Sequence, residues 1–300
     1  MNRVNSRIIS FAFLAFLLAG CSSETDNPGK LFKQLNVIPI EAHRGGGFLL
    51  PENTLETFEY TWNQRLFPEA DIRTSKDDVI ICMHDDTPRR LAPDTPVDLI
   101  DKDFSEMNLA TVKTLDVGIF RGKPGERVPT LEEVFQVMQG KPERFLALDY
   151  KDIDLDRLAD MVRQYHLEKQ VIFTSQYYHL IREWKKRIPE SLTMMWMGTK
   201  QIDIENKISM LEAAEFKDIS IIQVYFVANK EAQNGKILTN AKFFADKRKQ
   251  VEAHDILFLV FSWKDDRPEV YQELKDLGIQ AFATDYPEMA RNVYLGNDNQ

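Results

Sequence analysis

Apolar and polar positions alternate along the chain with two different periods. Short apolar runs bounded by turn residues, such as 144–151 and 256–263, are typical of buried strands. Longer segments between them have apolar residues at helical spacing, and Leu55, Phe58 and Trp62 predict one buried helix face. The predicted strands are 36–43, 69–75, 79–85, 144–151, 170–176, 192–198, 218–226, 256–263 and 280–287. The predicted helices are 53–64, 131–138, 178–188, 204–216, 240–254 and 268–278.

This regular alternation of strands and helices predicts the fold class. We count about eight strand units, most of them followed by a helix, which favours parallel strands with helical crossovers. The most economical arrangement is a closed (β/α)8 TIM barrel, and an open, doubly wound sheet is the alternative. In a barrel of this kind the chemistry is placed at the carboxyl ends of the strands.

The first twenty residues differ from the rest of the chain. Two arginines precede an apolar run that is too short for a stable membrane span, so 1–20 is predicted to be a secretory signal. The run ends in the sequence LAGC at 18–21, which resembles the lipobox of bacterial lipoproteins. That resemblance implies cleavage before Cys21 and its lipidation. An ordinary signal peptide with an incidental cysteine is the alternative.

Residues 21–35 are polar and rich in turn formers, so they are predicted to be a tether between the lipid and a domain that spans 36–300. Localisation then follows: the chain is expected to be exported and anchored by lipid to the bacterial cell envelope. Ser22 and Ser23 are compatible with sorting to the outer membrane.

Composition limits the remaining functions. A hydrophobic share of 43% excludes disorder of the chain as a whole. Removal of 1–20 leaves 36 basic against 47 acidic residues, a formal charge of −11, which argues against general nucleic-acid binding. If Cys21 is lipidated, Cys82 is the one cysteine left, so an intramolecular disulfide is excluded. Because Cys82 lies in an apolar run, it is predicted to be buried.

Two histidines lie at the ends of predicted strands, His43 in 36–43 and His84 in 79–85. Taken singly, each is more often structural than catalytic. Imidazoles titrate near neutral pH, however, so a pair on opposite sides of a substrate provides a base and an acid for one displacement. Phosphodiester cleavage needs such a pair.

Acidic residues form a second group at the predicted strand ends. Glu69 and Asp71 are two positions apart, which places both carboxylates on one face of a strand, and Asp149 ends another strand. Three converging oxygen donors favour a hard divalent cation, Mg²⁺ or Ca²⁺. A solvent-facing edge strand with unpaired acids is the alternative interpretation of Glu69 and Asp71 alone.

These motifs occur in an order that resembles a known family. The segment AHRGGGFLLPENTLETF at 42–58, followed by EADIRTSKDDVIICMHDDT at 69–87, is similar to the signature of the glycerophosphodiester phosphodiesterase family. The later stretches LALDYK at 146–151 and ATDYP at 283–287 resemble further strands of that family. Its barrel carries a small insertion beside the active site, after the second strand unit, and about 88–128 occupies that position.

The resemblance implies a role for each motif residue. His43 and His84 would be the acid and base, and Glu69, Asp71 and Asp149 would hold the metal. Arg44 and Lys151 would contact the substrate phosphate. Two departures affect the details: the family more often has glutamate at the position of Asp149, and the sequence SKDD at 75–78 lacks the glycine usual in that turn.

The implied activity is metal-dependent hydrolysis of glycerophosphodiesters to an alcohol and glycerol 3-phosphate. In the family, the neighbouring hydroxyl of the diester is thought to attack phosphorus and to form a cyclic phosphate, which water then opens. One alternative is phospholipase D-like cleavage of lysophospholipid or sphingomyelin. The other is a non-catalytic lipoprotein that binds phosphate esters.

Three further groups lie around the predicted strand ends. Glu52 either orients Arg44 or interacts with the dipole of the following helix, which is predicted to begin near Asn53. The glycines at 45–47 allow close approach of an anionic substrate. Trp196 and Trp263 are interpreted as core residues by default, with a place in the pocket wall as the alternative.

Overall fold

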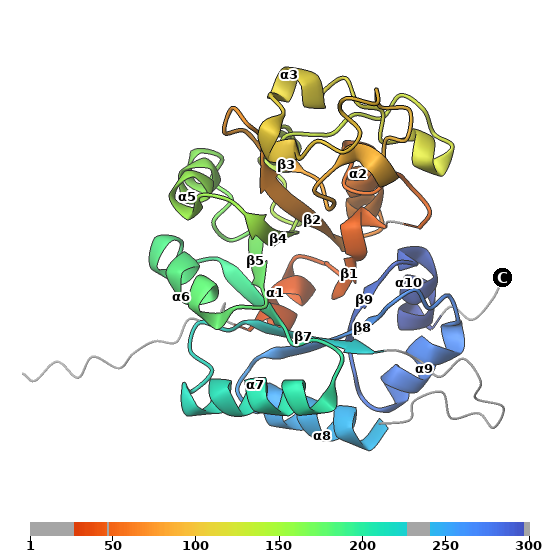
Figure 1. Ribbon diagram of the computed structural model, residues 1–300. Helices are drawn as coiled ribbons and strands as arrows, with labels where there is room; N and C mark the ends of the chain where they lie inside the picture. The colour runs from red at the N-terminus through yellow and green to blue at the C-terminus, as the bar shows by residue number, and fades with distance from the viewer. Residues whose placement is uncertain (1–26, 47, 227–240, 297–300) are drawn as a thin grey trace, which may run out of the picture.

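The computed structural model describes residues 27–46, 48–226 and 241–296 as a closed barrel surrounded by helices (Figure 1). Eight parallel strands run in the order β1, β9, β8, β7, β6, β5, β4, β2, and β1 also pairs with β2, which closes the sheet. The predicted (β/α)8 barrel is confirmed, and the doubly wound sheet is excluded. The strands are β1 (Ile40–Ala42), β2 (Phe67–Thr74), β3 (Ile80–Cys82), β4 (Leu146–Asp152), β5 (Val171–Ser175), β6 (Leu192–Trp196), β7 (Ile221–Phe226), β8 (Leu257–Ser262) and β9 (Ala281–Thr284).

Most of the described helices lie outside the barrel and connect successive strands, whereas α1 precedes β1 and α10 follows β9. They are α1 (Pro28–Gln34), α2 (Leu55–Asn63), α3 (Leu109–Val112), α4 (Leu131–Met138), α5 (Leu155–Gln164), α6 (Tyr178–Arg187), α7 (Gln201–Ala213), α8 (Ala241–Glu252), α9 (Pro268–Asp276) and α10 (Pro287–Leu295). Short 3-10 turns are η2 (His43–Gly45), η3 (Pro88–Arg90), η4 (Phe104–Glu106) and η5 (Ile119–Arg121). Among the described residues, no helix has the length and apolar character needed to cross a membrane.

Strand β3 differs from the other described strands in its direction. It is antiparallel to β2, with Ile72 opposite Cys82 and Thr74 opposite Ile80, and it lies outside the closed barrel. The sequence pattern predicts 79–85 as a strand without giving its direction, and because no helix separates it from β2, it pairs with β2 as a hairpin. Strand β2 is long enough to extend beyond the barrel, so β3 can run back along it.

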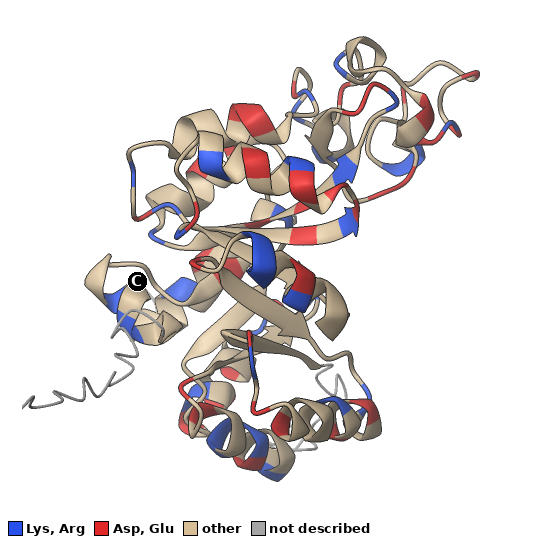
Figure 2. Ribbon diagram, turned by 90° about the vertical axis from the view of Figure 1, so that its left-hand side faces the viewer, with Lys and Arg blue, Asp and Glu red and all other residues tan. Residues whose placement is uncertain are grey.

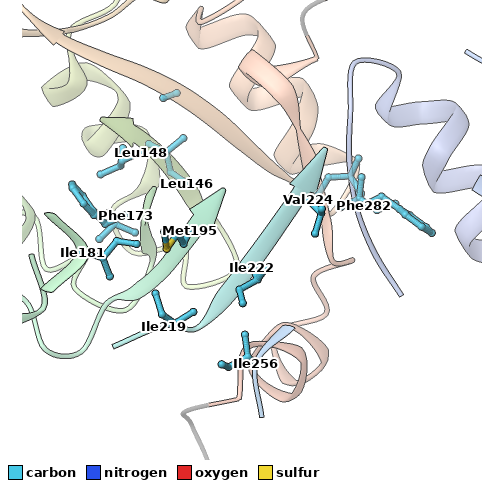
Figure 3. Close-up of a cluster of buried hydrophobic side chains, with 14 of the residues drawn as sticks. Leu146, Leu148, Phe173, Ile181, Met195, Ile219, Ile222, Val224, Ile256 and Phe282 are labelled. Atoms are coloured by element: carbon cyan, nitrogen blue, oxygen red, sulfur yellow. The ribbon is translucent and has the colours of Figure 1, made fainter. Parts of the chain in front are cut away.

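The main apolar layer lies between the strands and the helices. Side chains alternate along each strand, so that Leu146 and Leu148 of β4 point outward and pack with Phe173 and Ile181, as Figure 3 shows. The residues between them, such as Ala147, face the barrel interior. Cys82 is fully buried in the outer layer, and burial raises the pKa of its thiol, as expected for a structural cysteine.

Helix α1 closes the bottom of the barrel. Phe32 is fully buried, with its ring centroid 5.3 Å from that of Phe67 and 4.9 Å from that of Phe145, at the amino ends of β2 and β4. The predicted tether is therefore wrong for residues 28–34. A single phenylalanine in a polar stretch carries little periodic signal, yet it occupies the lower end of the barrel. Residues 21–26 of the predicted tether lie outside the described residues, as do the predicted signal and Cys21.

The segment between β3 and α4 forms a separate layer of structure at the top of Figure 1, beside β3. It has its own small apolar cluster, formed by Ile81, Met83, Leu91, Ala92, Phe104, Met107, Val112, Leu115, Val117 and Val128. Its backbone is held internally by the Phe104 amide, which donates to the carbonyl of Asp86, and it is joined to the turn between β2 and β3 by the Lys76 amide, which donates to the carbonyl of Met107. The segment is thus a packed structure that reaches the barrel mouth.

Candidate active site

Strands β2 and β4 bring the three predicted carboxylates together. Glu69 lies opposite Ala147 and Asp71 lies opposite Asp149 in the parallel ladder, so the three acids face the barrel interior at neighbouring levels. One carboxylate oxygen from each lies within 4.8 Å of the others, and all three residues are buried. Period-two alternation on two adjacent strands is therefore sufficient to build the cluster.

Burial and mutual repulsion set the charge of this cluster. Burial, followed by the neighbouring Glu69 and Asp71, raises the pKa of Asp149 to about 7. Burial acts in the same direction on Asp71, but Lys151, His84 and Arg44 outweigh it and lower its pKa. One carboxyl of the cluster is thus poised to hold a proton near neutral pH.

Lys151 lies between two of the carboxylates. Its Nζ is 2.8 Å from Asp71 Oδ1 and 2.5 Å from Asp149 Oδ2. Burial opposes the charge of this ammonium, but the two aspartates dominate and raise its pKa. Lys151 therefore remains a cation at the edge of the cluster, where an anionic oxygen would meet it.

His43 is held by a carboxylate at the top of β1. Its Nδ1 lies 2.6 Å from Asp285 Oδ1, and its Nε2 lies 3.7 Å from Glu69 Oε2. Burial lowers the pKa of His43, but Glu69 and Asp285 together outweigh burial and leave the pKa raised. The bond to Asp285 directs Nε2 toward the acidic cluster.

His84 has an equivalent carboxylate partner. Its Nδ1 lies 2.7 Å from Asp85 Oδ1. The antiparallel course of β3 brings the histidine back to the level of the cluster, since the amide of Met83 donates to the carbonyl of Asp71. Arg73 fixes this return by donating from Nε to the carbonyl of Met83 and from Nη2 to the carbonyl of His84.

Arg44 connects the histidine loop to the carboxylates. Its backbone has φ 53° and ψ 29°, and its amide donates to Glu69 Oε2 at 3.1 Å. Its Nη1 donates to Glu52 Oε1 at 3.0 Å, and Arg90 from the insertion donates to both oxygens of Glu52. Glu52 precedes α2, which begins at Leu55 after its cap Thr54. The contact with Arg44 favours the orienting interpretation of Glu52 over the helix-dipole one.

Two site residues had no assigned role in the sequence prediction. Asn53 donates from Nδ2 to Asp71 Oδ2 at 2.8 Å and accepts from the Asp71 amide at 3.0 Å, which fixes this carboxylate. Asp285 orients His43 and also accepts from the backbone amide of Lys264. The sequence does contain both features, an asparagine in the motif PENT and an aspartate after the last strand. Neither pattern specifies which residue the side chain contacts.

The glycine run at 45–47 makes room for close packing beneath His43. A Cβ at Gly45 would lie 2.6 Å from Thr57 Cγ2 and 3.0 Å from Phe58 Cδ1, and the residue has φ 82°. Its carbonyl accepts from the Thr61 hydroxyl of α2. Gly45 therefore allows η2 to approach α2, which is a packing role. Gly47 lies outside the described residues.

A pocket of about 330 Å³ opens above these groups. Both histidines line it, as do Arg44 and Trp263. Trp263 is thus part of the pocket wall, whereas the ring of Trp196 packs against Tyr225 at 5.8 Å. The pocket is lined by His43, Arg44, Phe48, Glu52, His84, Asp85, Arg90, Phe120, Arg121, Trp263, Lys264 and Asp285.

A barrel with paired histidines above buried carboxylates defines a TIM-barrel enzyme class suited to acid–base chemistry on an anion. The Glycerophosphoryl diester phosphodiesterase family profile matches residues 43–289, and the chain belongs to that family. It is accordingly a phosphoric diester hydrolase, as predicted. A glycerophosphodiester phosphodiesterase of Caldanaerobacter subterraneus subsp. tengcongensis is 26% identical over 264 residues, covering 85% of this chain and 96% of the relative.

Solved structures share the fold. A putative glycerophosphoryl diester phosphodiesterase from Silicibacter pomeroyi DSS-3 superposes with a TM-score of 0.70 at 19% identity, covering 87% of this chain and 94% of that one. An Oleispira antarctica phosphodiesterase, in complex with the product sn-glycerol-3-phosphate, superposes with a TM-score of 0.64 at 20% identity, covering 86% and 97%. These similarities place the barrel and its helices in the same arrangement.

Proposed function

We propose that this enzyme hydrolyses glycerophosphodiesters to an alcohol and glycerol 3-phosphate, with His43 as the first proton donor and His84 as the first proton acceptor. The observation that carries the proposal is the pair of imidazoles that line one pocket, each held at Nδ1 by an aspartate. Such a bond fixes the tautomer and leaves Nε2 to exchange protons with substrate. The phosphodiesterase from Oleispira antarctica, in complex with sn-glycerol-3-phosphate, supports this product.

A divalent cation fits the cluster of Glu69, Asp71 and Asp149. The three carboxylates crowd into a buried space, and their repulsion contributes to the raised pKa of Asp149. A cation there would relieve that repulsion, and an all-oxygen donor set favours Mg²⁺ or Ca²⁺. When bound, the cation would offset negative charge on the phosphoryl oxygens.

The protein cations complete the phosphate site. Lys151 borders the cluster, and Arg44 lies with Nε 3.9 Å from Asp71 Oδ2. Arg44 Nε is buried and has no hydrogen-bond partner among the described residues, so its N–H can donate to a phosphoryl oxygen. Asn53 and Glu52 hold the surrounding carboxylate and guanidinium in place.

The proton transfers follow from the two dyads. His84 Nε2 accepts the proton of the neighbouring hydroxyl as its oxygen bonds to phosphorus. The bond from phosphorus to the leaving alcohol breaks, and His43, whose raised pKa favours the imidazolium, gives its proton to that oxygen. Water then opens the cyclic phosphate with the two roles reversed, which returns both imidazoles to their starting states.

The test is glycerol 3-phosphate release by the purified full chain in a neutral detergent. Glycerophosphocholine and other deacylated diesters are supplied, EDTA is added, and Mg²⁺ or Ca²⁺ is then restored in excess. We expect release that EDTA stops and one of the cations restores. EDTA saturated with Ca²⁺ beforehand is the matched control for the chelator itself.

The other outcomes separate the alternatives. Release that continues in EDTA would contradict the metal requirement. Cleavage of lysophospholipid or sphingomyelin without cleavage of any deacylated diester would favour the phospholipase D-like activity. A folded chain that binds the cation and cleaves none of these substrates would favour the phosphate-ester-binding lipoprotein.

Export and lipidation remain part of the proposal. The apolar run before LAGC at 18–21 supports a lipoprotein anchored to the bacterial envelope through Cys21, with the outer membrane as its destination. Radiolabelled palmitate incorporated by the wild type and lost in Cys21→Ser would support the anchor. Equal incorporation in both chains would contradict it.

A further inference from the structure

Cations cover the faces of the aromatic side chains in the outer part of the candidate pocket. Arg121 Cζ lies 4.9 Å from the ring centroid of Phe48 and 4.7 Å from that of Phe120. Lys264 Nζ lies 4.5 Å from the ring centroid of Trp263 and 5.9 Å from that of Phe48. We call these five residues the cation–aromatic rim. All of them line the same pocket as the two histidines.

The rim differs from an aromatic cage for a quaternary ammonium group. Such a cage presents open ring faces to a ligand cation. Here the ring of Phe48 is stacked on Tyr286, with centroids 5.5 Å apart and planes at 16°, in addition to its contacts with the two protein cations. Each of the three rings therefore already contacts a protein cation, and an incoming choline would meet like charge.

The carboxylates of the pocket are already bound to other groups. Glu52 accepts from Arg90 at 2.6 Å, and Asp85 accepts from Arg90 at 2.7 Å. Asp285 is bound to His43. These acids therefore pair with Arg90 and His43, and two further cations, Lys264 and Arg121, line the same pocket.

The backbone of Lys264 is held by the same carboxylate that orients the catalytic histidine. Its backbone amide donates to Asp285 Oδ2 at 2.9 Å, while the other oxygen of the same carboxylate binds His43. The adjacent Asp265 pairs with Arg267 at 2.7 Å. Within the described ranges, no carboxylate lies at ion-pair distance from the Lys264 ammonium. Asp285 therefore fixes the positions of both the proton donor, His43, and the backbone of Lys264 in the cation–aromatic rim.

The attraction of an anion to this rim must be local. The chain has a formal charge of −9, and Figure 2 shows acidic and basic residues interspersed over the surrounding helices. An exposed cation acts over about 10 Å or less at moderate salt. Only a charge carried close to the scissile phosphodiester is within this range.

We propose that the cation–aromatic rim binds the leaving alcohol of the diester and selects alcohols that carry a further negative charge, such as a second phosphodiester. This inference rests on the proposed hydrolysis and names its preferred substrate class. The second anion would contact Lys264 and Arg121, while the aromatic side chains support the apolar part of the alcohol. A substrate whose leaving alcohol is cationic, such as choline, would bind this site more weakly.

The experiment compares two matched substrates and one cationic substrate on the full chain. 1,3-Bis(glycerophospho)glycerol and glycerophosphoglycerol have the same reacting end and differ by one distant phosphodiester. The expected order of kcat/KM is the bis-diester, then glycerophosphoglycerol, then glycerophosphocholine, with steps of roughly three- to tenfold through KM, weakening as salt is raised.

Variants then assign the preference to the rim. Lys264→Gln and Arg121→Gln should each lower kcat/KM for the bis-diester by roughly threefold or more and raise it for glycerophosphocholine. Lys33→Gln, in helix α1 at the other end of the barrel, is the matched control and should leave the ratio unchanged. Equal kcat/KM for the three substrates, or a ratio that neither rim variant alters, would overturn the proposal.

The failure of this inference can be told from failure of the proposed function. If no diester of either series releases glycerol 3-phosphate, the hydrolysis itself is contradicted. If all the diesters are cleaved without a preference for an anionic alcohol, only the role assigned to the rim is contradicted. Comparing lysophosphatidylglycerol, whose leaving alcohol is neutral, with lysophosphatidylcholine tests on acylated substrates only whether a cationic alcohol is disfavoured.

Discussion

The two halves of the barrel interior are built by the same strands and have opposite chemistry. In the lower half, Phe67 and Phe145 pack against Phe32 of α1. In the upper half, Asp71 and Asp149 occupy the same faces of β2 and β4, a few residues further along. Because side chains alternate with a period of two, one strand can supply an apolar layer and then a charged one. Stability and chemistry are thus separated along the strand axis.

A buried polar pair marks the boundary between the halves. Glu41 of β1 accepts from Gln223 Nε2 at 3.0 Å, and both residues are buried in the interior. Its second oxygen, Oε2, has no hydrogen-bond partner among the described residues. Burial, followed by the charge of Glu69, raises the pKa of Glu41. The change from apolar to acidic interior therefore begins one layer below the cluster.

The largest effect should follow from substituting the histidines at the upper end of the barrel. His43→Ala and His84→Ala should each lower kcat by roughly 10²- to 10⁴-fold, because each removes a proton-transfer group, while the melting temperature stays close to that of the wild type. Steady-state kinetics and thermal unfolding measure the two effects. His179→Ala, at an exposed position on α6, is the control. Unchanged turnover in either active-site variant would contradict the assignment.

A substitution in the lower half of the barrel interior should reduce stability and leave activity of the folded enzyme unchanged. Phe32→Ala removes a fully buried ring and should lower the free energy of unfolding by about 3–5 kcal/mol, measured by urea denaturation. The folded fraction should keep its KM, since the change is remote from the pocket. Leu295→Ala, at an exposed site, should shift stability by about 0.5 kcal/mol or less. A raised KM with unaltered stability would mean that the halves are not separate.

A smaller effect is expected in how the metal affinity of the upper half depends on pH. The pKa of Asp149 is raised to about 7, so this carboxyl binds a proton below that pH and ionises above it. A metal must displace the proton at low pH, so its affinity should fall roughly tenfold from pH 8 to pH 6. Isothermal titration with Mg²⁺ or Ca²⁺ measures this. In Asp149→Asn the affinity should be weaker and nearly independent of pH, and equal pH dependence in both chains would contradict the assignment.

Much of the barrel was predictable because its parallel strands leave a repeated pattern. Apolar runs separated by amphipathic helices indicated the barrel, and the period of two placed Glu69 and Asp71 on one face. The antiparallel β3 was not predicted. A buried strand has the same apolar pattern in either direction, so the pattern alone does not distinguish a barrel strand from a hairpin.

The partners of the site residues were the other gap. His43, His84 and the acids were found from their positions after strands, but Asp285 and Asn53 acquire their roles only when distant segments meet. Pairs such as His43 and Asp285 are 242 positions apart, which no local spacing reports. Phe32 was missed for a related reason, since one apolar residue has no period.

The closure of the barrel by α1 has a consequence for how substrate reaches the enzyme. Residues 22–27, between the proposed lipid on Cys21 and the start of α1 at Pro28, extend at most about 20 Å. With that anchor, the lower end of the barrel is held beside the bilayer, and the histidines open at the opposite end. The enzyme would then draw its diesters from the aqueous space and release its products back into it.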